Sequence, residues 1–165
     1  MRLYSPSMTS DLHPQTVLEN FIAGGKKFLS LAQNIPAEKL NRSPGAEEWS
    51  AAFVIHHMAD SELHFATRYL FNLVDDRPPI QGFNEEFYPD RTHYDKRNPA
   101  NSIQALKGIR AMVEEILTNA TPDDWKRISV RFDGEEVTLL QIVDTAAGHS
   151  KAHKEQLESI LVDGK

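Results

Sequence analysis

The stretch that indicates how this chain folds is residues 148–156, with the sequence GHSKAHKEQ. It lies in a segment with the spacing of a helix, and it places His149 and His153 four positions apart. Positions i and i+4 share one face of an α-helix. Two imidazoles on one face can bind one metal ion. A useful site needs a third ligand, which a neighbouring helix would have to supply.

The candidates for the third ligand are His56 and His57, which begin the sequence HHMAD. Adjacent helical residues point about 100° apart, so only one of the two can face a site. One stripe of this predicted helix holds polar side chains: His57, Asp60, His64 and Arg68. A stripe of this kind either lines a site or faces solvent, and the pattern alone fits both.

Apolar residues at helical spacing predict a first helix that begins near Pro14, a residue suited to a first helical turn. Gly24 and Gly25 interrupt the pattern, and each glycine costs about 1 kcal/mol relative to alanine in a helix. We interpret the pair as a close helix–helix contact or a kink. Ser50 suits the N-cap of a second helix that runs to about Val74.

Two more helices are predicted from capping boxes, NSIQ at residues 101–104 and TLLQ at residues 138–141. Between them, residues 128–137 alternate with a period of two, and Asp133-Gly134 predicts a hairpin with a type I′ turn. Four helices and one hairpin describe an all-α fold, a four-helix bundle with a short β-hairpin before the last helix.

The composition fits one cytoplasmic domain over residues 1–165, with residues 1–11 as an irregular N-terminal arm. The net charge is −6 and no cluster of Lys or Arg stands out, which argues against nucleic acid as a partner. No apolar run approaches the roughly 20 residues of a membrane span. The chain has no cysteine, so any metal must be held by histidines and carboxylates.

The segment 75–101 breaks the helical pattern with four prolines and carries four aromatic residues. Long irregular segments are uncommon unless they are functional or disordered, and the aromatic residues favour a packed loop. Asp60, Glu85 or Glu86 could act as a base or accept a hydrogen bond from a ligating imidazole. The ordinary interpretation of Glu85 and Glu86 is a solvated loop, and that of His13 and His93 is a surface position.

Three neutral imidazoles would leave a divalent ion with its full charge and an open coordination position, as in catalytic rather than structural zinc sites. An open position binds water or a thiol and lowers its pKa. Zn, Ni, Fe and Co suit three imidazoles comparably, so the metal is not identified.

Several pieces of the chain together resemble the DinB/YfiT-like family of metal-binding four-helix bundles. The matching pieces are Trp49-Ser50, HHMADS at 56–61, Arg68-Tyr69, DDRPPI at 75–80, and His149, His153 and Gln156. The hairpin before the last helix also fits the YfiT-like branch. Many members carry a doubled histidine in the last-helix motif, whereas this chain has Ala152 before His153.

The resemblance implies a metal site made of His57, His149 and His153, with His56 as the fallback for His57. It also implies that Arg68 and Gln156 contact a cofactor, and that the protein forms a homodimer. Members of the family are described as candidate metal-dependent hydrolases, and related proteins transfer thiols such as bacillithiol or mycothiol.

Three hypotheses follow. The first is a metal-dependent thiol S-transferase that acts on a small-molecule electrophile, received by the aromatic loop. The second is a hydrolase that uses metal-bound hydroxide with Asp60, Glu85 or Glu86 as base. The third is a stress protein that binds a metal or small ligand without turnover.

Overall fold

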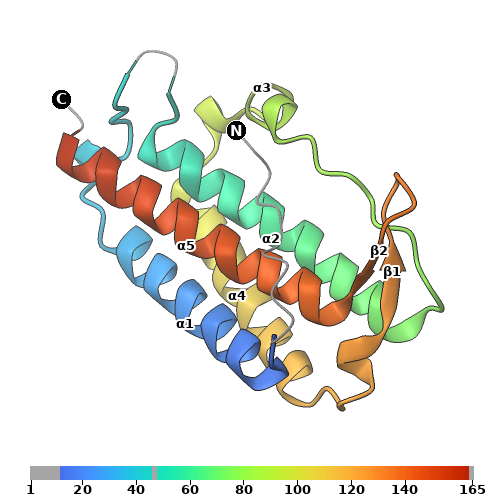
Figure 1. The fold of residues 1–165 in the computed structure, drawn as a ribbon. Coiled ribbons are helices and arrows are strands. Elements are labelled where there is room, and N and C mark those ends of the chain that lie inside the picture. Colours follow the sequence, from blue (N-terminus) through green and yellow to red (C-terminus); the bar gives the residue numbers. More distant parts are fainter. Residues whose placement is uncertain (1–11, 46–47, 164–165) are drawn as a thin grey trace.

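The computed structural model describes residues 12–45 and 48–163, so the expected arm at residues 1–11 lies outside the described residues. Four long helices dominate the fold: α1 (Pro14–Gln33), α2 (Ala51–Val74), α4 (Pro99–Thr118) and α5 (Leu139–Asp163). α1 packs along α5, α5 along α2, α2 along α4, and α4 along α1, which closes a ring of helices around the core (Figure 1). The predicted all-α four-helix bundle with a hairpin before its last helix is confirmed.

The first two helices begin where their sequences predict. Pro14 occupies the first turn of α1, where its missing N–H costs no hydrogen bond. The hydroxyl of Ser50 accepts a hydrogen bond from the Phe53 N–H at 3.3 Å and so caps α2. α2 ends at Val74, as expected, and the proline-rich segment follows.

Of the two predicted capping boxes, the second is confirmed and the first is wrong. Thr138 Oγ1 accepts from the Gln141 N–H at 3.2 Å, and Gln141 Oε1 accepts from the Thr138 N–H at 2.8 Å. α4 instead begins at Pro99, because Asn98 Oδ1 already accepts from the Ala100 N–H at 3.0 Å. Ser102 therefore lies inside the helix, where its hydroxyl is free to make a tertiary contact.

The hairpin pairs β1 (Ile128–Val130) with β2 (Glu136–Thr138) in antiparallel register. Its turn is not type I′, because Gly134 has a positive φ of 86° and Asp133 does not. The Arg131 N–H donates to the Glu135 carbonyl at 2.8 Å, which leaves a three-residue loop that closes on the left-handed glycine. β1 also pairs with Pro79 in a parallel bridge, so the hairpin is held against the segment that follows α2.

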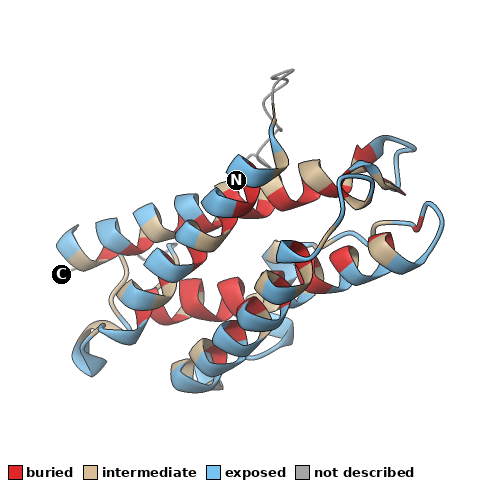
Figure 2. Cartoon of the chain, turned by 90° about the horizontal axis from the view of Figure 1, so that it is seen from below, coloured by how far each residue is buried: buried red, intermediate tan, exposed pale blue. Residues whose placement is uncertain are grey.

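Buried residues face inward on all four helices and exposed residues face outward (Figure 2). The apolar core consists of two clusters. One contains Phe21, Tyr69 and Val143, and the other contains Phe28, Ile55 and Leu157. Buried polar side chains lie between these positions along the helices, and they include His57 and His153, whereas His149 is half-buried.

The centre of this buried polar layer is an ion pair between α2 and α4. Arg110 Nη2 lies 2.8 Å from Glu62 Oε2, and both side chains are almost fully buried. Arg110 also donates to the Ser150 hydroxyl at 2.5 Å and to the Phe21 carbonyl at 2.9 Å. The guanidinium therefore joins all four helices. Both Nη atoms of Arg110 have partners, whereas Arg110 Nε and Glu62 Oε1 are buried without one among the described residues. Burial accordingly raises the pKa of Glu62.

The glycine pair in α1 makes room for this layer, which confirms the prediction of a close helix–helix contact. A Cβ added at Gly25 would lie only 2.4 Å from Arg110 Nη1. A Cβ added at Gly24 would meet the Ser150 Cβ at 3.5 Å, an ordinary van der Waals distance. Of these two positions, therefore, only residue 25 has too little space for a side chain.

The segment between α2 and α4 is ordered by short helices rather than by long elements. It contains η2 (Glu85–Phe87), α3 (Tyr88–Arg91) and η3 (Tyr94–Lys96), and it lies against α2. Tyr94 is fully packed, whereas Phe87 is 59% exposed.

Within the described residues, no helix has the length and apolar character needed to cross a membrane.

Candidate metal centre

Three histidines from two helices converge near the middle of the bundle. His149 and His153 lie one turn apart on α5, and the packing of α5 along α2 brings His57 opposite them. The Nε2 atoms of His57 and His149 are 3.0 Å apart. One nitrogen from each of the three rings lies within 4.8 Å of the others. Three donor atoms this close together can converge on one ion if the rings turn slightly toward a common point.

Burial keeps these imidazoles neutral. It lowers the pKa of His57 to about 3, with a further contribution from His153. It also lowers the pKa of His153, and it holds that of His149 well below the ordinary value. Metal binding requires neutral imidazoles, so the three rings are already in the protonation state that can donate a lone pair to a metal at neutral pH.

The hydrogen bonds of His153 prepare one nitrogen for a metal. Its Nδ1–H donates to Gln156 Oε1 at 2.7 Å. The lone pair is therefore on Nε2, which is buried without a hydrogen-bond partner among the described residues. A ligating histidine normally donates its other N–H in this way, which fixes both ring orientation and tautomer. The residues present therefore fit a divalent metal ion.

Gln156 thus contacts a candidate ligand, and its predicted contact with a cofactor stays a prediction.

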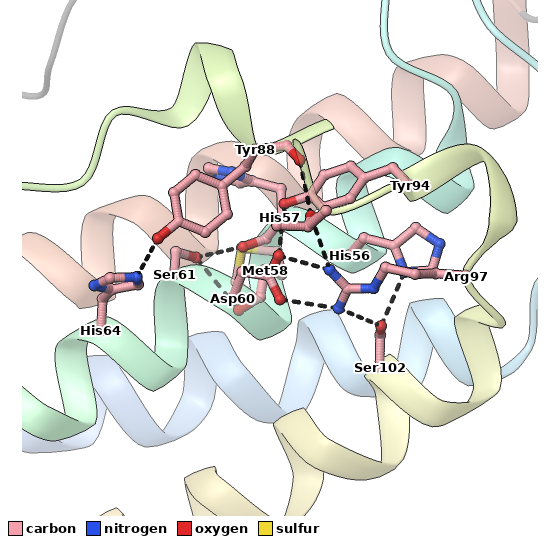
Figure 3. A network of polar contacts seen from close by, with 11 residues as sticks. His56, His57, Met58, Asp60, Ser61, His64, Tyr88, Tyr94, Arg97 and Ser102 are labelled. Atoms are coloured by element: carbon pink, nitrogen blue, oxygen red, sulfur yellow. Dashed lines mark hydrogen bonds and ion pairs between the residues drawn. The ribbon is translucent and has the colours of Figure 1, made fainter. Parts of the chain in front are cut away.

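The structure separates the two adjacent histidines of α2. His56 turns away from the cluster, and its Nδ1 lies 2.8 Å from the Ser102 hydroxyl on α4 (Figure 3). Burial, together with the nearby charge of Arg97, lowers the pKa of His56 to about 4. His57 rather than the fallback His56 faces His149 and His153.

Aromatic rings surround the cluster. The Trp49 ring lies 4.9 Å from that of His57 and stacks nearly parallel to that of His153 at 6.5 Å, centroid to centroid. Phe65 packs 5.8 Å from the His149 ring, and Phe83 of the loop lies 5.7 Å from the His57 ring. These rings keep water from the imidazoles and give the site an apolar wall.

The polar stripe of α2 lines the interface with the loop rather than facing open solvent. Tyr88 of the loop places its hydroxyl 2.5 Å from His64 Nε2. Asp60 accepts hydrogen bonds from both Nη atoms of Arg97, at 2.7 and 2.9 Å, and from the Tyr94 hydroxyl at 2.9 Å (Figure 3). Asp60 thus anchors the loop to α2. Its catalytic role stays a prediction that these contacts do not support.

The two loop glutamates have different surroundings. Glu85 Oε2 lies 3.7 Å from His57 Nε2, and its side chain is only 26% exposed. Burial raises the pKa of this carboxyl group. Glu86 is exposed. Of the two candidate loop bases, Glu85 is therefore the one that the fold places beside the histidines.

A cavity of about 390 Å³ adjoins the loop side of α2. Its lining residues come from one face of α2, from the segment that follows α2 and from β1: His64, Thr67, Arg68, Phe71, Asp75, Pro78, Pro79, Ile80, Gln81 and Ser129. Arg68 donates to the Gln81 carbonyl at 2.9 Å, and its guanidinium lies over the Phe65 ring. Arg68 is therefore one aromatic ring away from His149.

The sequence patterns did not predict the roles of Trp49 and Arg110 in this part of the molecule. Both roles depend on contacts between residues far apart in the chain, for which a local pattern carries no signal. Phe83 and Tyr88 were expected only as part of a packed aromatic loop.

Comparison with known proteins gives this geometry a context. A family model for the DinB superfamily matches residues 21–157. A "Putative metal-dependent hydrolase" from Geobacillus thermodenitrificans is 24% identical over 124 residues, which cover 74% of this chain and 70% of that protein. The "Putative metal-dependent hydrolase YfiT" from Bacillus subtilis is 24% identical over 106 residues, or 64% of this chain and 60% of that protein.

Solved structures show the same fold. YfiT from Bacillus subtilis superposes with a TM-score of 0.82 at 19% identity, over 95% of this chain and 91% of that one. A mycothiol-dependent maleylpyruvate isomerase superposes with a TM-score of 0.74 at 15% identity, over 94% of this chain and 70% of that one. The match of the family model to residues 21–157 spans most of the sequence, and the chain therefore belongs to the DinB superfamily, with YfiT-like relatives.

Proposed function

We propose that this protein is a metal-dependent enzyme of the thiol S-transferase type. The observation that carries the proposal is the convergence of His57, His149 and His153, three neutral imidazoles in a largely buried site. A divalent ion held by them, such as Zn, Ni or Fe, would lower the pKa of a bound thiol and supply a thiolate at neutral pH.

The surroundings of the histidines favour sulfur over water as the nucleophile. The aromatic rings of Trp49, Phe65 and Phe83 cover the imidazoles, and they would make favourable contacts with the polarizable sulfur of a bound thiol. The similarly folded isomerase is named as dependent on mycothiol, a low-molecular-weight thiol. A thiol of this class is the cofactor that we propose, and its sulfur would bond to a small electrophilic substrate.

The chain's own residues have separate roles in this proposal. Gln156 holds the proton on His153 Nδ1 and so keeps Nε2 free. The Asp60–Arg97 ion pair fixes the loop that carries Phe83 and Glu85 over the site. Arg68, beside the cavity on α2, offers a positive charge to an acidic group of the thiol or substrate.

Hydrolysis is the second candidate, and one contact favours it. Glu85 lies 3.7 Å from His57 Nε2, where it could take a proton from an attacking water. Relatives of this chain are named as metal-dependent hydrolases. A homodimer and a cytoplasmic location belong to the proposal as expectations from the family.

The test begins with metal content. Purified wild type, His57→Ala, His149→Ala and His153→Ala are each loaded with Zn²⁺ and analysed for bound metal after gel filtration. We expect each variant to retain about a tenth or less of the wild-type content, because a ligand is lost. His93→Ala is the matched control, because His93 is an exposed histidine remote in sequence from the cluster.

Activity then separates the candidates. The loaded protein is assayed with several low-molecular-weight thiols and a chromogenic electrophile, and separately with ester and amide substrates. Thiol-dependent turnover supports the transferase, and thiol-independent cleavage supports the hydrolase. Tight metal binding without turnover on either set would mean a binding protein, and unchanged metal content in all three histidine variants would refute the site.

A further inference from the structure

The structure points to a fourth ligand for the proposed metal ion: we infer that the carboxylate of Glu85 binds it from the loop side. This inference rests on the metal site of the proposed function. It concerns the position that three histidines alone would leave open.

Distance is the first argument. An ion with four ligands at about 2.0–2.1 Å in tetrahedral geometry holds neighbouring donor atoms about 3.3 Å apart. The pair His57 Nε2 and His149 Nε2 is 3.0 Å apart, and the pair His57 Nε2 and Glu85 Oε2 is 3.7 Å apart. Both pairs lie close to the required spacing. Glu85 is not in the group of donor atoms that all lie within 4.8 Å of one another, so its side chain would have to rotate toward His149 and His153 to complete the ligand set.

Charge is the second argument. Three neutral imidazoles leave the full charge of a divalent ion uncompensated in a site from which water is largely excluded, and this is costly. Positive charge also acts on the site from the bundle, since Arg110 and Arg68 both help to lower the pKa of His149, after burial and the other two histidines. A carboxylate at the site would offset this excess.

Availability is the third argument. Among residues 12–45 and 48–163, Glu85 is the carboxylate within ion-pair distance of the histidine cluster. Glu62 is paired with Arg110, and Asp60 is paired with Arg97. Neither of those groups can approach the histidines without breaking a short ion pair.

The loop holds Glu85 in place for this role. Phe83, two residues earlier, packs its ring between those of His57 and His64, at 5.7 and 4.7 Å. Tyr88, three residues later, contacts His64 through its hydroxyl. The short η2 helix is therefore fixed to α2 on both sides of the carboxylate.

This assignment changes the expected coordination of the metal ion. The fourth position would be occupied by the Glu85 carboxylate, and an incoming thiol would have to displace Glu85 or bind beside it. The loop from Phe83 to Tyr88 would then control access to the metal ion.

The experiment measures metal affinity and coordination without any assay of turnover. Wild type, Glu85→Gln, Glu85→Ala and Glu86→Gln are titrated with Zn²⁺ against a chromogenic chelator, and each is loaded with Co²⁺ for its visible spectrum. We expect Glu85→Ala to weaken Zn²⁺ binding at least about tenfold and to change the Co²⁺ absorption bands. Glu85→Gln should show the same changes to a smaller degree, because an amide oxygen is a weaker ligand.

Glu86→Gln is the control for charge alone, because it removes the same charge one residue away from an exposed position. It should bind Zn²⁺ like the wild type. Melting of the metal-free variants checks that the loop substitutions leave the fold intact.

A wild-type affinity and Co²⁺ spectrum in Glu85→Ala would overturn the inference and leave the three-histidine site standing. If the wild type itself binds no metal, the proposed function fails first.

Discussion

At the residue scale, the histidines of α2 differ from ordinary surface histidines by what surrounds them. His56 and His57 are fully buried, whereas His13 and His93 are exposed, as the sequence predicted for the latter two. Burial disfavours the imidazolium form and therefore links the stability of the metal-free fold to pH.

The direction of this link can be tested on metal-free protein. The unfolded chain takes up protons on histidine below pH about 6.5, whereas in the folded protein His56 has a pKa of about 4 and His57 of about 3. Their contribution to stability is therefore present above pH 6.5 and is lost as the pH falls. Each imidazole should lower the free energy of unfolding by about 1.4 kcal/mol per pH unit below 6.5, measured by urea unfolding from pH 7.5 to 5.5.

Burial also raises the pKa of Glu62, which makes the free energy of unfolding change with pH in the opposite direction to the effect of the histidines. A comparison of variants that each lack one imidazole isolates the contribution of that imidazole. The free energy of unfolding of His56→Gln should fall less steeply with decreasing pH than that of the wild type, and the difference should equal the contribution of one imidazole. His93→Gln should keep the wild-type slope. An equal slope in His56→Gln and the wild type would contradict the prediction.

At the element scale, the contact of α1 with the buried polar layer depends on the absence of a Cβ atom at Gly25. The added Cβ of Gly25→Ala would meet the Arg110 guanidinium, which contacts Glu62, Ser150 and the Phe21 carbonyl. We expect a loss of about 1–3 kcal/mol in the free energy of unfolding, because overpacking outweighs the gain in helix propensity.

The neighbouring glycine provides the matched control. Gly24→Ala has ordinary van der Waals room beside Ser150. It should be neutral or more stable by up to about 1 kcal/mol, the helix propensity difference. Equal effects of the two substitutions in urea unfolding would show that Arg110 does not set the approach of α1.

Element boundaries were predictable where a local cap decides them. Pro14, Ser50 and the Thr138–Gln141 box act through residues adjacent in sequence, so their positions could be read directly. The box at residues 101–104 failed because Asn98 caps the helix earlier and Ser102 contacts His56 instead.

The turn type failed for a related reason, which lies in the strand pairing. The sequence Asp133-Gly134 fits a two-residue turn, but the backbone pairing of Arg131 with Glu135 makes the loop one residue longer. Register of this kind depends on which strand positions face the bundle, and the turn residues alone do not determine it.

The candidate site was predictable in part. The spacing of His149 and His153 follows from helix geometry, but their approach to His57 depends on the packing of α5 against α2. The same holds for Trp49, whose ring reaches the site through a tertiary contact. The distinction between Glu85 and Glu86 required the path of the loop, which no periodicity describes.

At the scale of the whole molecule, a bound ion would connect helices whose ligands lie 92 positions apart in the chain, His57 and His149. A ligand that binds only the folded state stabilises it by about 2.7 kcal/mol at 100 times its Kd. For a chain of this size that corresponds to a rise in Tm of roughly 5–10 °C.

Calorimetry of the protein with excess Zn²⁺ and with EDTA measures this difference. His149→Ala should show no such rise, since it lacks one ligand. A Tm in the wild type that does not depend on metal would count against a site that spans the two helices.

The Arg110 layer has a consequence for how the four helices are aligned along the bundle axis. The apolar clusters on either side of it would tolerate a slide of one helix by a turn, about 5.4 Å, because contacts between apolar side chains are not directional. Arg110 would not, since a slide would separate it from Glu62, from Ser150 and from the space beside Gly25. The guanidinium thus fixes the axial register of the four helices, and this register keeps the histidines of α5 opposite His57.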